Sequence, residues 1–265
     1  MAAGWKVAII ERKLFGGTCV NTGCTPTKTL VASAYAAHVT RRAADYGMTI
    51  SGAVSVDMKL VKTRKDAIVA QSRNGLERSL KTLKGCTVYE GHGQFAAEKK
   101  VAVNGSELGA DRIFINVGTR AAVPPIPGLD RVPYLTNSSM MDIDFLPSHL
   151  IVLGGNCVDL EFAQMYRRFG SEVTVIEFAP RLIPREDKEV SQAIAAFLRE
   201  EGVDVRAESK VVGVEKNGNT IAIKVESAGT ISHVLGTHVL VAFGRRPNTD
   251  DLGLDKAGIA TDERG

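Results

Sequence analysis

Short apolar runs that end at a glycine or a glutamate recur along the chain and predict parallel β-strands. In the plainest case, the apolar run 150–153 is followed by the glycine pair 154–155 and by an amphipathic segment from 158 to 169. Uninterrupted apolar runs are typical of strands covered on both faces, whereas apolar residues three or four positions apart indicate a helix. Gly170 is placed to end that helix. The pattern therefore predicts the strand, tight turn, helix and further strand of an α/β fold.

The strand that ends at Glu177 has a counterpart near the start of the chain. Residues 4–11 and 170–177 both begin with glycine, continue into an apolar run and end with glutamate. A carboxylate at the C-terminal end of such a strand is where a doubly wound fold holds a ribose hydroxyl. Only the second copy is preceded by a strand, glycine turn and helix, so we expect the first unit to be truncated at its N-terminus. The alternative is a chance likeness, because buried strands of this kind occur in every α/β protein.

A second repeated sequence pattern predicts where the chain passes between two domains. Gly118 follows the apolar run 113–115, Gly244 follows the run 239–241, and a basic residue comes soon after each glycine. The proline-rich segment 124–128 predicts an extended linker between them.

These features set the expected domain boundaries. We expect one domain over residues 1–122 that resumes over 244–265, where it is truncated, and a second domain over 123–243 inserted into it. The spacing of apolar residues from 55 to 83 predicts one long helix that is broken near Gly75.

The composition excludes several classes of protein. The 265 residues are 44% hydrophobic and 24% charged, and 33 Lys+Arg against 30 Asp+Glu leave a net charge of +3. This apolar content excludes intrinsic disorder, and no apolar run approaches the ~20 residues of a membrane helix. The charge is too small to indicate nucleic acid or a membrane surface as a partner. Four cysteines do not make a disulfide scaffold in a chain of this length, and no secretory leader precedes Glu11, so we expect a cytoplasmic protein.

Cys19 and Cys24 are the most informative pair of residues. Five positions of a regular helix separate two residues by ~7.5 Å along the axis alone, beyond the ~7 Å Cα separation that a disulfide tolerates. If the cysteines bridge, the backbone must leave the helix between them, which residues 21–23 (Asn-Thr-Gly) allow. Pro26 suits the first turn of a following helix, so Cys24 would lie at its N-terminus, where the dipole favours a thiolate. With Lys28 one turn further on, the pair has the features of a redox device.

Other interpretations of the two cysteines compete with redox chemistry. A zinc site would need further Cys or His in suitable pairs, which His38 and His92 do not supply. A structural bridge does not suit a cytoplasmic chain. From the spacing alone, a redox pair and two buried free thiols both remain open.

The sequence from Gly16 to Lys28, GGTCVNTGCTPTK, resembles the active-site signature of the class I pyridine nucleotide–disulfide oxidoreductases. This family includes dihydrolipoamide dehydrogenase, glutathione reductase and mercuric reductase, and the signature is most similar to that of the mercuric reductase-like branch. Further likenesses lie at Glu11, around Gly118, at 160–163 and at 244–248.

The resemblance implies an α/β fold of two Rossmann-like, three-layer ββα domains, with an NAD(P)-binding domain inserted in an FAD-binding domain. The domain over 1–122 and 244–265 would then bind FAD, without its first strand and glycine turn, and the domain over 123–243 would bind NAD(P)H.

The resemblance also implies a reaction. NAD(P)H would pass a hydride to FAD, and the flavin would reduce a Cys19–Cys24 disulfide that passes the electrons to Hg(II) or a small disulfide. Cys24 would lie nearer the flavin and form the charge-transfer thiolate, and Cys19 would be the interchange thiol that meets the substrate. Lys28 would lie beside the reactive nitrogen of the flavin, with Glu161 as its ion-pair partner.

Two carboxylates would hold ribose groups under the same resemblance. Glu11 would bind the adenosine ribose of FAD, and Glu177 would bind the ribose of NADH and favour it over NADPH. The other residues expected at the cofactors are Gly17, Thr18, Gly118, Thr119, Gly154, Gly155, Gly244 and Arg245.

The glycine turn of the nucleotide unit departs from the family pattern. Where the family has G-x-G-x-x-G, residues 154–159 read GGNCVD. Asn156 adds a side chain where the second glycine admits the pyrophosphate, and Asp159 adds a charge where the third glycine lets the helix pack. The carboxylate would compete with the pyrophosphate for the helix N-terminus. A working NADH site and a degenerate turn that binds dinucleotide weakly are both open.

Three functions follow as alternatives: a mercuric reductase-like enzyme, a dihydrolipoamide dehydrogenase-like enzyme, or a non-catalytic truncated or degenerate product. The family's C-terminal dimerisation domain, which carries a His–Glu pair, would lie beyond Gly265. We expect a longer parent protein to be a homodimer that acts on small molecules, without a nucleic-acid or membrane partner and without a resident metal.

Overall fold

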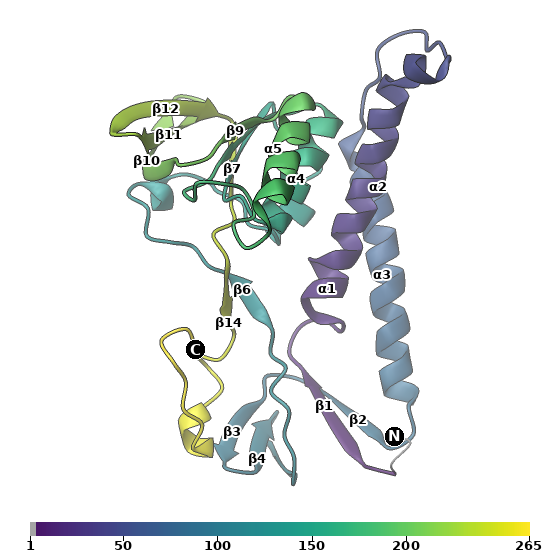
Figure 1. The fold of residues 1–265 in the computed structure, drawn as a ribbon. Coiled ribbons are helices and arrows are strands. Elements are labelled where there is room, and N and C mark those ends of the chain that lie inside the picture. The colour runs from purple at the N-terminus through teal and green to yellow at the C-terminus, as the bar shows by residue number, and fades with distance from the viewer. Residues whose placement is uncertain (1–3) are drawn as a thin grey trace. The chain divides into compact units, whose positions relative to one another are not determined.

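A computed structural model describes residues 4–265, which divide into two compact units (Figure 1). The first unit comprises the chain up to Thr25 together with residues 67–120 and 245–265. The second unit comprises residues 26–66 and 121–244. Residues 26–66 thus group with the second unit rather than with the segments next to them in sequence. The reason is packing, since Leu30, Ala34 and Met58 are buried in the second unit's core.

The first unit contains a pair of parallel strands and a small antiparallel sheet. Strand β1 (Val7–Glu11) pairs in parallel with β2 (Cys86–Glu90). Strands β3 (Gln94–Ala97), β4 (Lys100–Val103) and β5 (Ser106–Gly109) form the antiparallel sheet. Phe95 packs with Leu252 and Leu254 in a separate small core. The short helix α1 (Gly17–Asn21) follows β1.

The second unit is built on a parallel sheet of four strands. Their order is β13 (His238–Val241), β7 (His149–Leu153), β8 (Glu172–Ile176) and β9 (Asp204–Arg206). The longer helices of this unit are α4 (Cys157–Phe169), α5 (Lys188–Glu200), most of α2 (Cys24–Arg41) and the first part of α3 (Met58–Thr82). A three-stranded antiparallel sheet, β10 (Lys210–Asn217), β11 (Thr220–Ser227) and β12 (Thr230–Gly236), completes it.

Alternate residues of β7 face two different layers. Leu150 and Val152 belong to the core that holds Phe162 of α4, whereas Ile151 belongs to the core that holds Ile223 of β11. The parallel sheet is therefore covered by helices on one face and by the antiparallel sheet on the other, as the ribbon shows (Figure 1). The predicted α/β fold with three ββα layers is confirmed for this unit, and the apolar run 150–153 is explained by burial on both faces.

The two similar segments around Gly118 and Gly244 pair with each other. Strand β6 (Thr119–Ala121) and strand β14 (Arg245–Pro247) form a two-stranded sheet at the points where the chain passes between the units. Gly244 O accepts a hydrogen bond from Ala122 N (2.9 Å), and Gly118 O accepts one from Asn248 N (3.0 Å).

Two predicted details are wrong and one is only partly right. The helix α3 (Met58–Thr82) continues through Gly75 without a break (Figure 1), because a lone glycine lowers helix stability without removing a hydrogen bond. The apolar run 113–115 is not a strand: it belongs to none of the described strand pairs, and Phe114 is 81% exposed. Strand β1 forms as predicted, but it is only half-buried because β2 is its single described partner.

Candidate active site

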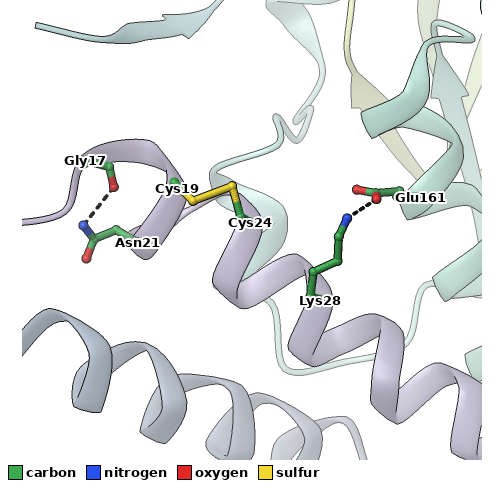
Figure 2. Close-up of a disulfide and its surroundings, with 6 residues drawn as sticks. All are labelled: Gly17, Cys19, Asn21, Cys24, Lys28 and Glu161. Carbon is green, nitrogen blue, oxygen red and sulfur yellow. Dashed lines mark hydrogen bonds and ion pairs between the residues drawn. A yellow bond between two sulfur atoms is a disulfide. The ribbon is translucent and has the colours of Figure 1, made fainter. Parts of the chain in front are cut away.

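A break between two helices brings Cys19 and Cys24 together. Helix α1 ends at Asn21, and Cys24 is the first residue of α2. The two cysteines form a disulfide with a Cα–Cα distance of 4.6 Å (Figure 2). Gly23 makes the turn possible, since a Cβ there would lie 2.8 Å from the carbonyl oxygen of Thr18. The backbone leaves the helix between the cysteines as the spacing requires, and both cysteines are exposed.

Asn21 braces the segment that carries the disulfide. Its Nδ2 donates hydrogen bonds to the carbonyl oxygens of Phe15 and Gly17, both at 2.9 Å. The bond to Gly17 is visible beside the disulfide (Figure 2). These bonds fix both ends of α1, a helix too short to be stable by itself. The sequence predicts Asn21 only as a turn residue, because its contact with the start of the helix depends on how the chain folds back.

A cavity of about 460 Å³ in the first unit collects most of the residues expected at a flavin. Its lining residues are Glu11, Gly16, Gly17, Thr18, Asn116, Gly118, Thr119 and Arg245. Two of these, Gly16 and Asn116, were not among the predicted site residues, and the predicted Gly244 is not part of the lining. The signal for Asn116 lies in the sequence, because it stands two residues before Gly118 in the segment that follows the apolar run 113–115.

Arg245 is held over this cavity by hydrogen bonds. Its guanidinium donates to the carbonyl oxygen of Thr119 (2.6 Å), to the Thr119 hydroxyl and to the Thr18 hydroxyl (3.3 Å). Burial lowers the pKa of Arg245 from its ordinary value, but an arginine remains charged at neutral pH. The cavity therefore offers a fixed positive group, a carboxylate from Glu11 and open backbone at Gly17 and Gly118.

Glu11 and Glu177, which end the two similar sequence segments, also make similar hydrogen bonds. Oε1 of Glu11 accepts a bond from the backbone N–H of Lys13 (2.8 Å), and Oε1 of Glu177 accepts one from Ala179 N–H (2.6 Å). Each carboxylate thus follows a parallel strand and is anchored to the backbone two residues further along. The same local geometry in both units supports the interpretation that residues 4–11 and 170–177 are two related strands.

Lys28 and Glu161 form an ion pair in the second unit. Lys28 lies one turn after Cys24 on α2, and its Nζ contacts Oε1 of Glu161 on α4 (Figure 2). The Lys28 side chain is 63% exposed and the Glu161 side chain 35% exposed. Since partly exposed pairs stabilise a fold by at most about 1 kcal/mol, this pair is better placed to orient a charge than to stabilise the unit.

The carboxylate of Asp159 packs against the turn formed by residues 154–159. Asp159 is only 3% exposed, and its Oδ2 accepts a hydrogen bond from the backbone N–H of Asn156 (2.8 Å) at the N-terminus of α4. Burial raises the pKa of Asp159 to about 7; the hydrogen bond opposes this rise, and the charge of Glu177 adds to it. Gly154 and Gly155 lie between the two carboxylates, since a Cβ on either would come within 3 Å of Asp159 Oδ2 or Glu177 Oε2, respectively.

Metal ligation and membrane crossing find no support among residues 4–265. These residues contain no group of three or more His, Cys, Asp or Glu that could hold a metal ion. None of their helices combines the length and the apolar character that crossing a bilayer requires. The two cysteines outside the disulfide, Cys86 and Cys157, are free.

Comparison with known proteins places this arrangement in a family. The model of the pyridine nucleotide-disulphide oxidoreductase family matches residues 1–265. A mercuric reductase of Bacillus cereus is 35% identical over 265 residues, which are all of this chain and 42% of the relative. A dihydrolipoyl dehydrogenase of Acholeplasma laidlawii is 33% identical over 269 residues, covering 98% of this chain and 79% of the relative.

A solved structure gives the same result. The HOCl-induced flavoprotein disulfide reductase RclA from Escherichia coli matches with a TM-score of 0.85 and 35% identity, over 100% of this chain and 57% of that one. The chain thus spans about half the length of several relatives that it matches. On the match of the family model to the whole chain, this chain belongs to the pyridine nucleotide-disulphide oxidoreductase family.

Proposed function

We propose that this chain is the dinucleotide-binding and disulfide-bearing part of a flavin-dependent NAD(P)H oxidoreductase that reduces Hg(II) or a small disulfide. The observation that carries the proposal is the exposed Cys19–Cys24 disulfide, which follows directly on the segment Gly16–Thr18 of the glycine-lined cavity. A disulfide at a helix N-terminus is chemically suited to accept two electrons and to present a thiolate afterwards.

The cavity residues fit an FAD dinucleotide. Gly17 and Gly118 have positive φ angles of 55° and 68°, and a Cβ on either would meet no atom within 4 Å. Their backbone is therefore open to a ligand, as close approach to a cofactor requires. Glu11 offers a carboxylate for ribose hydroxyls, as in other doubly wound units. When bound, FAD would supply the chemistry of accepting a hydride from a nicotinamide and passing two electrons to a disulfide.

The chain's own residues would take distinct roles in this reaction. Cys24, at the first position of α2, would be the thiol nearer the flavin, and Cys19 the one that meets the substrate. Lys28 would present its charge to the flavin ring while Glu161 orients it. Glu177 would hold the nicotinamide nucleotide's ribose and favour NADH. In this proposal, residues 1–122 and 244–265 bind FAD, residues 123–243 bind NAD(P)H, and the whole protein is a cytoplasmic homodimer.

Two other functions keep support from specific observations. The relatives named dihydrolipoyl dehydrogenase are as similar to this chain as those named mercuric reductase, so a dithiol substrate such as dihydrolipoamide is the second candidate. The buried Asp159 in the nucleotide turn favours a third possibility, a chain that keeps the fold but binds dinucleotide weakly.

Flavin retention tests the proposal. The purified 265-residue chain would be incubated with FAD, desalted, and its visible spectrum recorded before and after reduction with a dithiol. We expect a retained flavin band and, after reduction, a long-wavelength band that Cys24→Ser abolishes. Cys86→Ser is the matched control, because Cys86 is a free cysteine of the same unit, and this variant should behave like the wild type. A colourless protein, or a Cys24→Ser variant with an unchanged spectrum, would contradict the proposal.

A further inference from the structure

Asp159 stands at the third glycine position of a dinucleotide-binding turn, beside the helix end that would accept the pyrophosphate. It is the third residue of α4, and its Oδ2 bonds to the N–H of Asn156 just before the helix. A Cβ on Gly154 would lie 2.7 Å from the same oxygen, so the carboxylate packs directly against the glycine turn. The N–H groups of this helix end and the turn beside it are what a pyrophosphate would contact. An ionised Asp159 therefore competes with the ligand for the same positive field.

The groups around Asp159 do not neutralise it. From the end of β8 it faces Glu177, which is the charged group that acts on it among the described residues. On the other side of the turn, a Cβ on Gly154 would lie 2.9 Å from the carbonyl oxygen of Ala242, which carries no positive charge. Burial and the charge of Glu177 favour the protonated form of Asp159, and they outweigh the hydrogen bond from Asn156 N–H, which favours the charged form.

We propose that Asp159 couples dinucleotide binding to the uptake of one proton, so that the pyrophosphate binds at the N-terminus of α4 when this carboxyl is protonated. The inference rests on the proposed function, since it takes the ligand to be a nicotinamide dinucleotide. Protonation removes the charge that repels the pyrophosphate and leaves the neutral side chain in place. Since the carboxyl titrates near pH 7, dinucleotide affinity is tuned across the physiological range by a residue of the turn itself. In this role Asp159 is a determinant of affinity rather than a catalytic residue.

The proposal predicts a defined pH dependence for NADH binding. Below pH 6 the dissociation constant should be flat, and above the Asp159 transition it should rise up to tenfold per pH unit, the limit for one linked proton. Calorimetry of NADH binding to the 265-residue chain at pH 8, in two buffers of different ionisation enthalpy, should show uptake of close to one proton. The Asp159→Asn variant should bind NADH with little pH dependence and no proton uptake. Its side-chain oxygen can still accept the bond from Asn156, so the turn keeps its shape.

A matched control and a direct titration separate the possible outcomes. Asp187→Asn removes an exposed carboxylate at the N-terminus of α5 in the same unit, and it should keep the wild-type pH dependence. A wild type whose NADH affinity is independent of pH, or an Asp159 carboxyl that titrates near pH 4 by carbon-detected NMR, would overturn the inference and leave the proposed function standing. If neither the wild type nor Asp159→Asn binds NADH at pH 6, the proposed nicotinamide chemistry is itself refuted, and the inference with it.

Discussion

The buried carboxyl of Asp159 should make the stability of this chain fall as the pH rises. Burial, with the charge of Glu177, raises the pKa of Asp159 from its ordinary value of 3.8 to about 7 in the folded chain. The unfolded chain therefore loses this proton first, and between the two pKa values the folded state binds more protons than the unfolded state. The linkage relation then requires the free energy of unfolding to decrease with pH over this interval and to level off above it. This sign is opposite to that of an aspartate in a salt bridge.

The size of the effect follows from the same interval. The two values lie about three pH units apart, and each unit corresponds to about 1.4 kcal/mol, so the full loss is at most about 4 kcal/mol. Between pH 5 and pH 8 the accessible part is about 2–3 kcal/mol. Asp159→Asn keeps a side-chain acceptor for the N–H of Asn156 and cannot ionise, so it should lack this loss.

Urea unfolding at pH 5 and pH 8 measures the effect. The free energy of unfolding of Asp159→Asn, relative to the wild type, should be higher at pH 8 than at pH 5 by about 2–3 kcal/mol. Every other titrating group is common to both proteins and cancels in the comparison. If the stability difference between the two proteins is the same at both pH values, Asp159 does not titrate near neutrality and the reasoning from its burial is wrong.

Three further substitutions test other parts of the structure by chemical unfolding. Gly75→Ala should stabilise the chain by about 0.5–1 kcal/mol, since Gly75 lies inside α3 with nothing within 4 Å of the new Cβ; a loss would show that α3 is strained there. Phe162→Ala should cost about 3–5 kcal/mol, because this side chain is 1% exposed between α4 and the parallel sheet; a cost below about 1 kcal/mol would contradict that packing. Lys28→Ala should change stability by less than about 1 kcal/mol, because the ion pair with Glu161 is partly exposed, and a larger loss would show a structural role.

The predictable parts of the fold are those that local patterns determine. The apolar run 150–153 predicts a buried strand. The structure explains the run, because both faces of β7 are covered and every position along it is apolar. The run 113–115 is likewise apolar but is not a strand, because a strand also needs ladder hydrogen bonds to a partner, and this run belongs to none of the described strand pairs. The grouping of residues 26–66 with the second unit depends on contacts of Leu30 and Met58 with distant residues. Contacts of that kind leave no local signature in the sequence.

In the site, too, features that depend on sequence spacing could be predicted, whereas features that depend on contacts in the folded chain could not. Helix geometry predicts that the backbone leaves the helix between Cys19 and Cys24 if the two cysteines bridge; they do bridge, and α1 ends and α2 begins between them. The double hydrogen bond of Asn21 depends on where Phe15 and Gly17 lie after the chain turns, so it could not be read from the sequence. For Asp159, the sequence identified competition with the pyrophosphate, but the burial that makes the carboxyl titrate near pH 7 came only from the structure.

Counting thiols after reduction by NADH tests the central claim most directly. The chain has four cysteines, of which two form the disulfide and two are free. The FAD-loaded chain would be mixed with NADH without oxygen, alkylated under denaturing conditions, and mapped by mass spectrometry. Without NADH, we expect alkylation at Cys86 and Cys157 only; with NADH, Cys19 and Cys24 should be alkylated as well. A disulfide that stays oxidised while NADH reduces the flavin would show that electrons do not pass to Cys19 and Cys24, and would contradict the account.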